Sequence, residues 1–271
     1  MDQKLPAYSS QFAPETLPAL LPTMPLGGIT ADWAWGGATG AGIRVAVIDS
    51  GIDASHEAIG GRVSRFVQIR EESEGLVYET EPHGDSCGHG TACASIIRAL
   101  APDCELYSVK VLGPGGSGRA AVFAAGLRWA IENGAHVCNL SLGTTKRDHY
   151  AVFHELADLA YFRNVALVAA ANNMPQPSFP SVYASVLSVA SHDVDDPHLF
   201  YANPNPPVEY GAHGINVQVA WPDGGWKTVT GNSFAAPHVS GLVASLLSKH
   251  PGLTVPQVKV ILWALAANMK H

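Results

Sequence analysis

The sequence predicts a single α/β domain with a three-layer, doubly wound and mostly parallel sheet. Short apolar runs alternate with longer amphipathic stretches over most of the chain from residue 43 onward. Strands that alternate with helices require right-handed crossovers, which place helices on both faces of a parallel sheet. With 271 residues, of which 47% are hydrophobic and 14% charged, the chain is able to bury one large core.

The apolar runs are the predicted strands, and the amphipathic stretches are the predicted helices. Strands are expected at residues 43–49, 104–112, 135–143 and 165–171, and helices at residues 119–134, at 151–162 and from His89 onward. Near the C-terminus, residues 233–250 have the pattern of a long buried helix that stops at a Pro-Gly pair, and residues 255–269 that of a second helix. Ligands of such sheets bind beyond the carboxyl ends of the strands, where Asp49, Ser141 and Asn173 fall.

Composition excludes several classes of function. A formal net charge of −7 and scattered Lys and Arg residues give no basic field for nucleic acid. No uncharged run approaches the roughly 18 apolar residues of a membrane helix. The first residues have one early Lys, no sustained apolar core and several prolines, unlike a signal peptide, so we expect a cytoplasmic location and no membrane partner. Four cysteines are too few for a disulfide scaffold and suit a reducing compartment.

Three separate segments carry the residue types of nucleophilic catalysis. Asp49 ends a predicted strand, His89 begins a predicted helix between two glycines, and Ser233 lies where another helix starts. A serine hydroxyl is a poor nucleophile at neutral pH, so it needs an imidazole as base and a carboxylate that fixes the tautomer of the imidazole. At a helix N-terminus Ser233 would also offer its backbone N–H to a developing negative charge. We expect Pro237 in the first turn of that helix, where proline is tolerated.

A series of sequence blocks resembles, in order, the signature blocks of the subtilisin-like serine peptidases, or subtilases. The blocks are VAVIDSGID, GHGTACA, VKVLGPGGSG, NLSLG, VAAANN and GNSFAAPHVSG, and the resemblance runs from about Ile29 to the C-terminus. The chain order Asp, His, Ser is also that of this family. The resemblance implies a serine endopeptidase that hydrolyses a polypeptide substrate through an acyl-enzyme, without a cofactor.

The resemblance also implies roles for particular residues. Asp49 would orient the imidazole, His89 would act as general base and then acid, and Ser233 would be the nucleophile. Asn173 falls on the oxyanion-hole asparagine of the family. The backbone segments that would pair with an extended substrate are Gly116, Ser117 and Gly118 on one side and Ser141, Leu142 and Gly143 on the other.

The chain departs from the family pattern at several positions. Asn172 stands where the family has Gly, so we expect a left-handed backbone there, which Asn tolerates. Residues 174–186, a short version of this segment, should form the floor of the primary specificity pocket. The calcium-binding loop of the family is missing around residues 101–105, so we expect no metal there. Cys93 coincides with the free cysteine of thiol-containing subtilases.

Several alternatives stay open at this point. His83, Cys87, His89 and Cys93 could be imagined as a metal cluster, but their spacing matches no usual zinc pattern. Residues 1–27 form a predicted extension before a domain at residues 28–271, either a loose tail or an inhibitory segment in the cleft, as in intracellular subtilisins. The chain could also be a dedicated peptide-maturation protease that removes leaders, or an inactive subtilase fold that binds peptides. The sequence indicates no oligomeric state.

Overall fold

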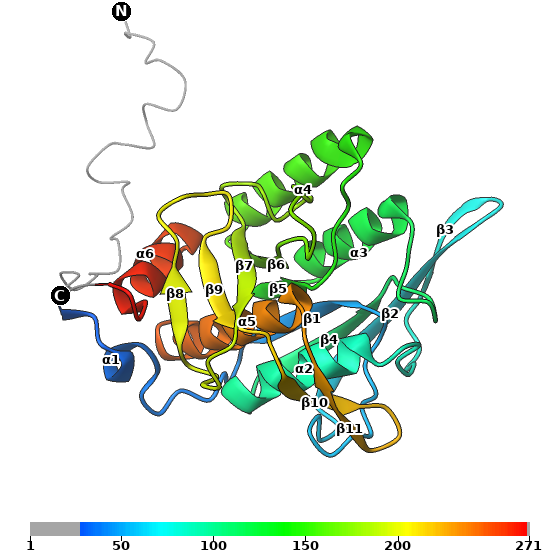
Figure 1. The fold of residues 1–271 in the computed structure, drawn as a ribbon. Helices are drawn as coiled ribbons and strands as arrows, with labels where there is room; N and C mark the ends of the chain where they lie inside the picture. Colours follow the sequence, from blue (N-terminus) through cyan, green and yellow to red (C-terminus); the bar gives the residue numbers. More distant parts are fainter. Residues whose placement is uncertain (1–27, 270–271) are drawn as a thin grey trace, which may run out of the picture.

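The computed structural model describes residues 28–269 and has the three-layer α/β fold that the sequence predicts (Figure 1). Its central sheet has nine strands. In spatial order they are β3 (Gly75–Glu79), β2 (Val63–Glu72), β4 (Glu105–Lys110), β1 (Arg44–Asp49), β5 (Val137–Leu140), β6 (Ala166–Ala170), β7 (Leu187–His192), β9 (Tyr210–His213) and β8 (Phe200–Ala202). Neighbours run parallel except at the two edges, where β3 pairs with β2 and β8 with β9 in antiparallel fashion. The predicted extension, residues 1–27, lies outside the described residues.

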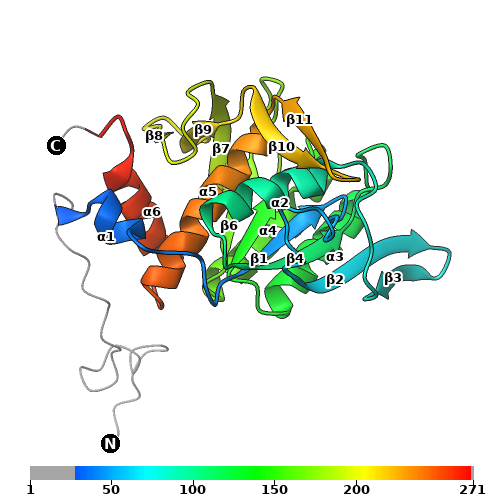
Figure 2. The same ribbon diagram turned by 90° about the horizontal axis from the view of Figure 1, so that it is seen from below.

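Strand β1 lies inside the sheet and buries both of its faces. Val45 and Val47 belong to the core on one face, while Ala46 and Ile48 belong to the core on the other. A continuous apolar run of this kind is typical of a parallel strand that helices cover on both sides. One face is covered by α1 (Ala31–Trp35), α2 (His89–Leu100), α5 (Asn232–Lys249) and α6 (Val255–Leu265), and the other by α3 (Ala120–Glu132) and α4 (Tyr150–Phe162), which follows the 3-10 turn η3 (Arg147–His149) (Figure 2).

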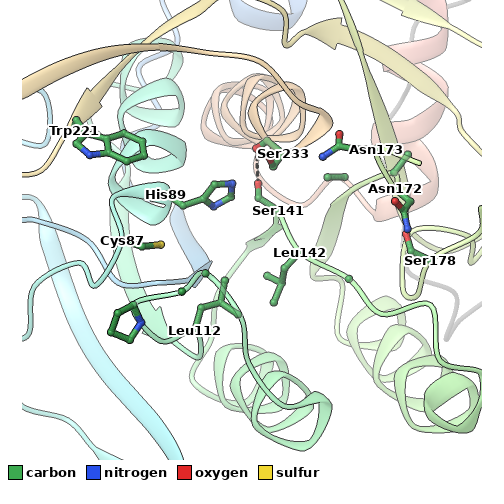
Figure 3. Close-up of a pocket in the computed structure, with 16 residues that line it drawn as sticks. Cys87, His89, Leu112, Ser141, Leu142, Asn172, Asn173, Ser178, Trp221 and Ser233 are labelled. Atoms are coloured by element: carbon green, nitrogen blue, oxygen red, sulfur yellow. Dashed lines mark hydrogen bonds between the residues drawn. The ribbon is translucent and has the colours of Figure 1, made fainter. Parts of the chain in front are cut away.

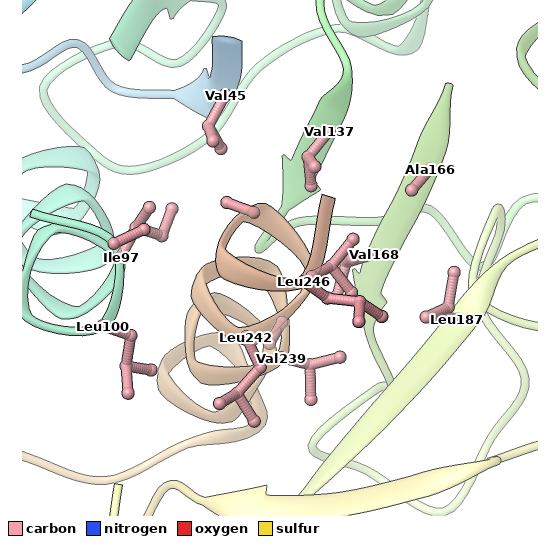
Figure 4. Close-up of a cluster of buried hydrophobic side chains, with 14 of the residues drawn as sticks. Val45, Ile97, Leu100, Val137, Ala166, Val168, Leu187, Val239, Leu242 and Leu246 are labelled. Atoms are coloured by element: carbon pink, nitrogen blue, oxygen red, sulfur yellow. The ribbon is translucent and has the colours of Figure 1, made fainter. Parts of the chain in front are cut away.

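Helix α5 runs through the first of these cores. Every residue from Phe234 to Leu246 is buried. Figure 4 shows Val239 and Leu246 among side chains of α2 and of the central strands. A Cβ at Gly241 would lie 2.7 Å from the Cβ of Leu100 on α2. The two helices therefore come into contact at a point where only glycine fits.

A separate antiparallel hairpin consists of β10 (Val217–Trp221) and β11 (Gly225–Val229). Val217 and Val219 pack against Ala92 and Ile96 of α2 and against Phe234 of α5. The hairpin thus lies beside the N-terminal ends of both helices. Among residues 28–269, none of the helices combines the length and the apolar character required to cross a bilayer.

Candidate active site

Three elements bring Asp49, His89 and Ser233 to one end of the sheet. Asp49 is the last residue of β1, His89 is the first residue of α2, and Ser233 is the second residue of α5. His89, Ser233 and Asn173 line one cavity of ≈ 630 Å³ (Figure 3), and Asp49 lies buried behind the imidazole. The carboxyl end of a parallel strand is where such a sheet binds ligands.

The Asp49 carboxylate holds the His89 ring. His89 Nδ1 lies 2.9 Å from both carboxylate oxygens, and Asp49 has no exposed surface. Because a carboxylate only accepts, the proton of a neutral ring lies on Nδ1 and the lone pair on Nε2. Burial disfavours the charged ring, but the negative charge of Asp49 outweighs this and raises the pKa of His89 far above its ordinary value of 6.5. The ring is therefore a strengthened base with a fixed tautomer.

Asp85, which the motif comparison did not single out, fastens the Asp49 turn to the start of α2. Its Oδ1 accepts from Ser50 Oγ (2.7 Å) and from the backbone N–H groups of Cys87 (3.0 Å) and Gly88 (2.8 Å). Its Oδ2 accepts from Thr91 N and Thr91 Oγ1, at 2.8 and 2.7 Å. Asp85 lies four residues before the first residue of α2, outside the N-cap position at Gly88, so no local capping pattern marks it. Asp85 thereby links the elements that carry Asp49 and His89.

The start of α2 packs so closely on the turn after β1 that a glycine is required in the GHGT block. A Cβ at Gly90 would lie 2.1 Å from the carbonyl oxygen of Gly51, which follows the Asp49-Ser50 pair. Gly90 N also donates to Ser50 Oγ at 3.0 Å. The start of α2 therefore packs directly on the turn after β1, which sets the separation of Asp49 and His89.

The position of Pro237 differs from the prediction. Helix α5 begins at Asn232, so Pro237 is its sixth residue and lies in the second turn, not the first. Proline has no N–H to donate to the carbonyl four residues earlier, which belongs to Ser233. That carbonyl instead accepts from Ser141 Oγ (2.7 Å) and from the Cys93 thiol (3.5 Å). The missing helical bond is replaced by side chains that tie the candidate nucleophile to β5 and α2.

Asn173 directs its side-chain amide into the cavity. Its Oδ1 accepts from Asn232 N at 2.9 Å, which leaves Nδ2 free to donate. A Cβ at Gly231 would lie 3.4 Å from Ser233 Oγ and 3.7 Å from Asn173 Nδ2, so both atoms border the same small space. Figure 3 shows the Asn173 amide beside Ser233 and the His89 ring on the other side. A donor and a hydroxyl are thus placed together, as a tetrahedral oxyanion would require.

The expected left-handed backbone at Asn172 is wrong. Within residues 28–269, positive φ angles outside glycine occur at Asn164, Asn216 and Asp223, and Asn172 is not among them. Its Oδ1 accepts from Met174 N at 2.8 Å, and its carbonyl accepts from Asn232 Nδ2 at 3.1 Å. The side chain therefore stabilises the turn by hydrogen bonding, so the backbone needs no unusual conformation.

The comparisons with known proteins agree with this geometry. The sequence profile of the Subtilase family matches residues 40–270. This chain belongs to the subtilase family. It is 33% identical to Subtilisin DY of Bacillus licheniformis over 251 residues, 86% of each protein. It is 34% identical to Subtilisin Savinase of Lederbergia lenta over 234 residues, 82% of each protein.

Other relatives are longer than the region they share with this subtilase. Subtilisin E of Bacillus subtilis (strain 168) is 33% identical over 238 residues, which are 82% of this chain and 60% of that protein. Among solved structures, a cold adapted subtilisin-like serine proteinase superposes with a TM-score of 0.69 at 29% identity, over 82% of this chain and 81% of that one. The protein is accordingly a subtilisin-like serine endopeptidase that acts on polypeptides.

The residues expected to pair with substrate in this subtilase are only partly gathered at the cavity. Ser141, Leu142, Gly143 and Gly116 line it, whereas Ser117 and Gly118 line two neighbouring cavities. The segment around Gly116 closes on itself, since Gly113 N donates to Ser117 O at 3.0 Å and Gly116 N to Gly113 O at 2.9 Å. Ser178, from the segment expected to form the pocket floor, also lines the cavity, as do Cys87, Leu112 and Trp221, for which no such role was expected.

A group of possible metal ligands lies within this subtilase's site. Ligand atoms of Asp49, His89 and Cys93 lie within 4.8 Å of one another. The cluster imagined from sequence is not the one formed, because His83 Nε2 lies 2.9 Å from Ser108 Oγ instead. Burial raises the pKa of the Cys93 thiol, so it stays protonated. A soft metal bound by these groups would occupy the Asp49–His89 pair.

Proposed function

We propose that Asp49, His89 and Ser233 are the catalytic triad of this serine endopeptidase and that Asn173 is an oxyanion donor. The observation that carries this assignment is the contact of both Asp49 oxygens with His89 Nδ1, at 2.9 Å, beside a cavity that His89 shares with Ser233 and Asn173. The arrangement supplies a nucleophile, a base with a fixed tautomer and an amide donor.

Each group has one task in the proposed reaction. Ser233 Oγ attacks the carbonyl carbon of the peptide bond while His89 Nε2 takes the hydroxyl proton. Asn173 Nδ2 and the free N–H of Ser233 donate to the oxyanion. His89 then gives its proton to the leaving amine, and an acyl-enzyme forms on Ser233. Water, activated by His89, hydrolyses the acyl-enzyme. Asp49 stays ionised throughout and stabilises the imidazolium.

We further propose that an extended substrate lies along Ser141, Leu142 and Gly143, with the turn of Gly116, Ser117 and Gly118 on its other side. Main-chain pairing of this kind gives affinity with little dependence on sequence. Among residues 28–269, no Asp, Glu, Lys or Arg side chain lines the cavity. A substrate side chain bound there would meet apolar and neutral polar groups, which favours uncharged residues next to the cleaved bond.

Labelling with a fluorophosphonate tests the triad, because only an activated serine reacts. We expect the wild-type chain to incorporate one label and Ser233→Ala none. Ser55→Ala is a matched control, since Ser55 Oγ is an exposed hydroxyl that donates only to Asp53. Label on Ser233→Ala, or none on the wild type, would contradict the assignment. Cleavage of a panel of unrelated peptides then separates a broad endopeptidase from a maturation protease, which would cut one sequence.

Asn173→Ala tests the oxyanion donor separately. We expect kcat to fall by about 10²–10³, the loss known for such a donor in another member of this family, with KM nearly unchanged. Asn172→Ala is the neighbouring control, since Asn172 Oδ1 accepts from Met174 N and the side chain stabilises the turn beside Asn173. An equal loss of kcat in both variants would assign the effect to the turn and not to the Asn173 amide.

A further inference from the structure

Three polar side chains are buried where the central sheet meets α5. Asn139 and Ser240 have no exposed surface, and Ser141 is 8% exposed. Asn139 belongs to β5, Ser141 follows that strand directly, and Ser240 lies on α5 seven residues after Ser233. Burying an amide or a hydroxyl costs free energy unless it is hydrogen-bonded. The hydrogen bonds of these groups must therefore be made inside the protein.

The alternation of side chains along β5 directs these groups toward α5. Val137 belongs to the core that contains α5, whereas Cys138 and Leu140 belong to the core on the other face of the sheet. Successive side chains of a strand point to opposite faces, so Asn139 and Ser141 lie on the same face as Val137. Figure 4 shows Val137 facing α5. The two polar residues thus face the helix that carries the candidate nucleophile.

The hydrogen bonds of the three side chains form one chain with a fixed direction. Ser141 Oγ lies 2.7 Å from the Ser233 carbonyl oxygen (Figure 3), and a carbonyl only accepts, so the single hydroxyl proton of Ser141 is used there. Ser141 Oγ must then accept from Asn139, whose Nδ2 lies 2.9 Å away. Asn139 Oδ1 in turn accepts from Ser240 Oγ at 2.9 Å. The chain of donors begins at Ser240 and ends at the Ser233 carbonyl.

The Ser233 carbonyl depends on this chain because its helical donor is missing. Pro237, four residues later, has no N–H, and the other donor is the Cys93 thiol at 3.5 Å. A thiol is a weak donor, so the Ser141 hydroxyl is the principal one. The carbonyl carbon and the Cβ that bears Oγ are bonded to the same Cα. Holding the carbonyl in one orientation therefore also sets the direction in which the Ser233 hydroxyl leaves the helix.

The chain ties α5 to β5 at two places. Ser240 and Ser233 lie about two helical turns apart, and Asn139 and Ser141 connect them across the sheet. Hydrogen bonds away from water are strong and strengthen one another along a chain. Loss of one member leaves the next polar group without its partner. A change at Ser240 should therefore be transmitted to Ser233.

We propose that Ser240, Asn139 and Ser141 are positioning residues that hold the Ser233 hydroxyl in line with the His89 imidazole. This proposal rests on the assignment of Ser233 as the nucleophile. The three side chains act through the Ser233 carbonyl and not through the substrate. Their contribution therefore belongs to the rate of attack by Ser233 and not to substrate affinity.

The test compares kcat, KM and the rate of fluorophosphonate labelling in variants of the full chain. In Ser141→Ala we expect kcat and the labelling rate to fall about tenfold with KM nearly unchanged, since a displaced reacting atom slows the chemical step. Ser141→Thr keeps the hydroxyl and should recover most of the rate. Ser240→Ala should slow both rates about threefold. The double variant should be no slower than Ser141→Ala, because the chain is already broken.

Ser245→Ala is the matched control on the same helix. Ser245 is 3% exposed and donates to the Leu100 carbonyl at 2.7 Å, so its replacement also removes one buried hydroxyl of α5. Measured in the Ser233→Ala background, Ser240→Ala and Ser245→Ala should each lower Tm by about 2–4 °C. With Ser233 intact, only Ser240→Ala should slow labelling. A merely structural role of Ser240 would lower Tm without this change in rate.

The proposal is overturned if Ser240→Ala is labelled at the wild-type rate, if Ser245→Ala slows labelling as much, or if Ser141→Ala raises KM at constant kcat. Ser240→Ala decides the matter by itself if Ser141→Ala fails to fold. Failure of the catalytic assignment gives a different result, namely label on Ser233→Ala. Full-rate labelling of Ser240→Ala together with none on Ser233→Ala would contradict the positioning role alone.

Discussion

Two histidine–aspartate pairs in this protein differ chiefly in the burial of the carboxylate. Asp49 has no exposed surface and lies 2.9 Å from His89 Nδ1, whereas Asp195 is 96% exposed and lies 3.8 Å from His213 Nδ1. In the first pair Nδ1 donates to the carboxylate, so Nε2 faces outward as a base. In the second pair Nε2 lies against a backbone carbonyl and Nδ1 faces the exposed carboxylate. The same two residue types thus form a buried, tightly oriented pair in one place and a loose pair at the surface in the other.

The comparison shows that the second partner of an imidazole decides its chemistry. The His89 ring is oriented by a buried anion, which raises its pKa, and is followed by a hydroxyl at a helix start. The His213 ring is oriented by a neutral carbonyl and lies beside the buried His238 ring. Proton transfer needs a charge that stabilises the imidazolium, which the buried Asp49 carboxylate supplies to His89.

Replacing the buried Asp49 carboxylate should have the largest effect on activity. In Asp49→Asn the amide cannot fix the Nδ1–H tautomer, so we expect kcat to fall about 10⁴-fold, as in other Asp–His–Ser triads. His89 must be unprotonated to act as base. Because Asp49 raises the pKa of His89, wild-type activity should decline as pH falls through a value above 6.5, and the residual activity of Asp49→Asn should decline at lower pH. Steady-state kinetics against pH measures both changes. Asp53→Asn, on the same turn, should match the wild type; an unshifted profile in Asp49→Asn would contradict the assigned cause.

The neutral ring of His238 should produce the next largest effect, on stability. Its folded pKa is about 4, below the ordinary value of 6.5, so the unfolded chain binds more protons between these values. Stability should therefore be highest above pH 6.5 and fall by about 3 kcal/mol as pH drops to 4. Urea unfolding of Ser233→Ala measures the slope, which His238→Gln should reduce and His154→Ala, at a half-exposed histidine, should not. Equal slopes in all three would remove His238 as the cause.

A smaller loss of activity is expected when Asp85, which links the elements that carry Asp49 and His89, is replaced. Asp85→Asn replaces one acceptor oxygen by an amide donor that faces other donors, such as Thr91 N or Gly88 N. We expect kcat to fall about tenfold, corresponding to about 1.4 kcal/mol, with KM nearly unchanged. The rate of fluorophosphonate labelling should fall in parallel, since the base is displaced. A rise in KM at constant kcat would show that Asp85 shapes the cleft and does not position His89.

The smallest effect on activity is expected from replacing Asp195, whose side chain is exposed. Asp195→Asn should change kcat/KM by less than about twofold, because Asp195 lies at a different cavity from Ser233 and on the surface. Peptide hydrolysis by the variant and the wild type measures this directly. A loss as large as that of Asp85→Asn would mean that the two cavities are coupled through α5.

The sequence predicted the central strands and the helices well, because a parallel strand buried on both faces is a continuous apolar run. It did not locate β2, β3 or the β10–β11 hairpin, which carry mixed surface patterns, nor β7, β8 and β9. Asp49, His89 and Ser233 could be chosen because each ends or begins a predicted element within a characteristic block. Asp85 could not, since its hydrogen bonds to Ser50 join segments 35 residues apart. The Asp195, His213 and His238 cavity depends on the packing of β9 against α5, which no local pattern contains.

The contact of α2 and α5 at Gly241 means that packing in the protein interior sets the relative positions of His89 and Ser233. The proposed base, His89, begins α2 and the proposed nucleophile, Ser233, is the second residue of α5. The two helices touch about two turns beyond Ser233, where a Cβ at Gly241 would lie 2.7 Å from Leu100. A methyl group added at Gly241 would push α2 and α5 apart and move the Ser233 hydroxyl away from the His89 imidazole, although every active-site side chain stayed the same. Turnover of this enzyme therefore depends on a glycine that does not contact substrate.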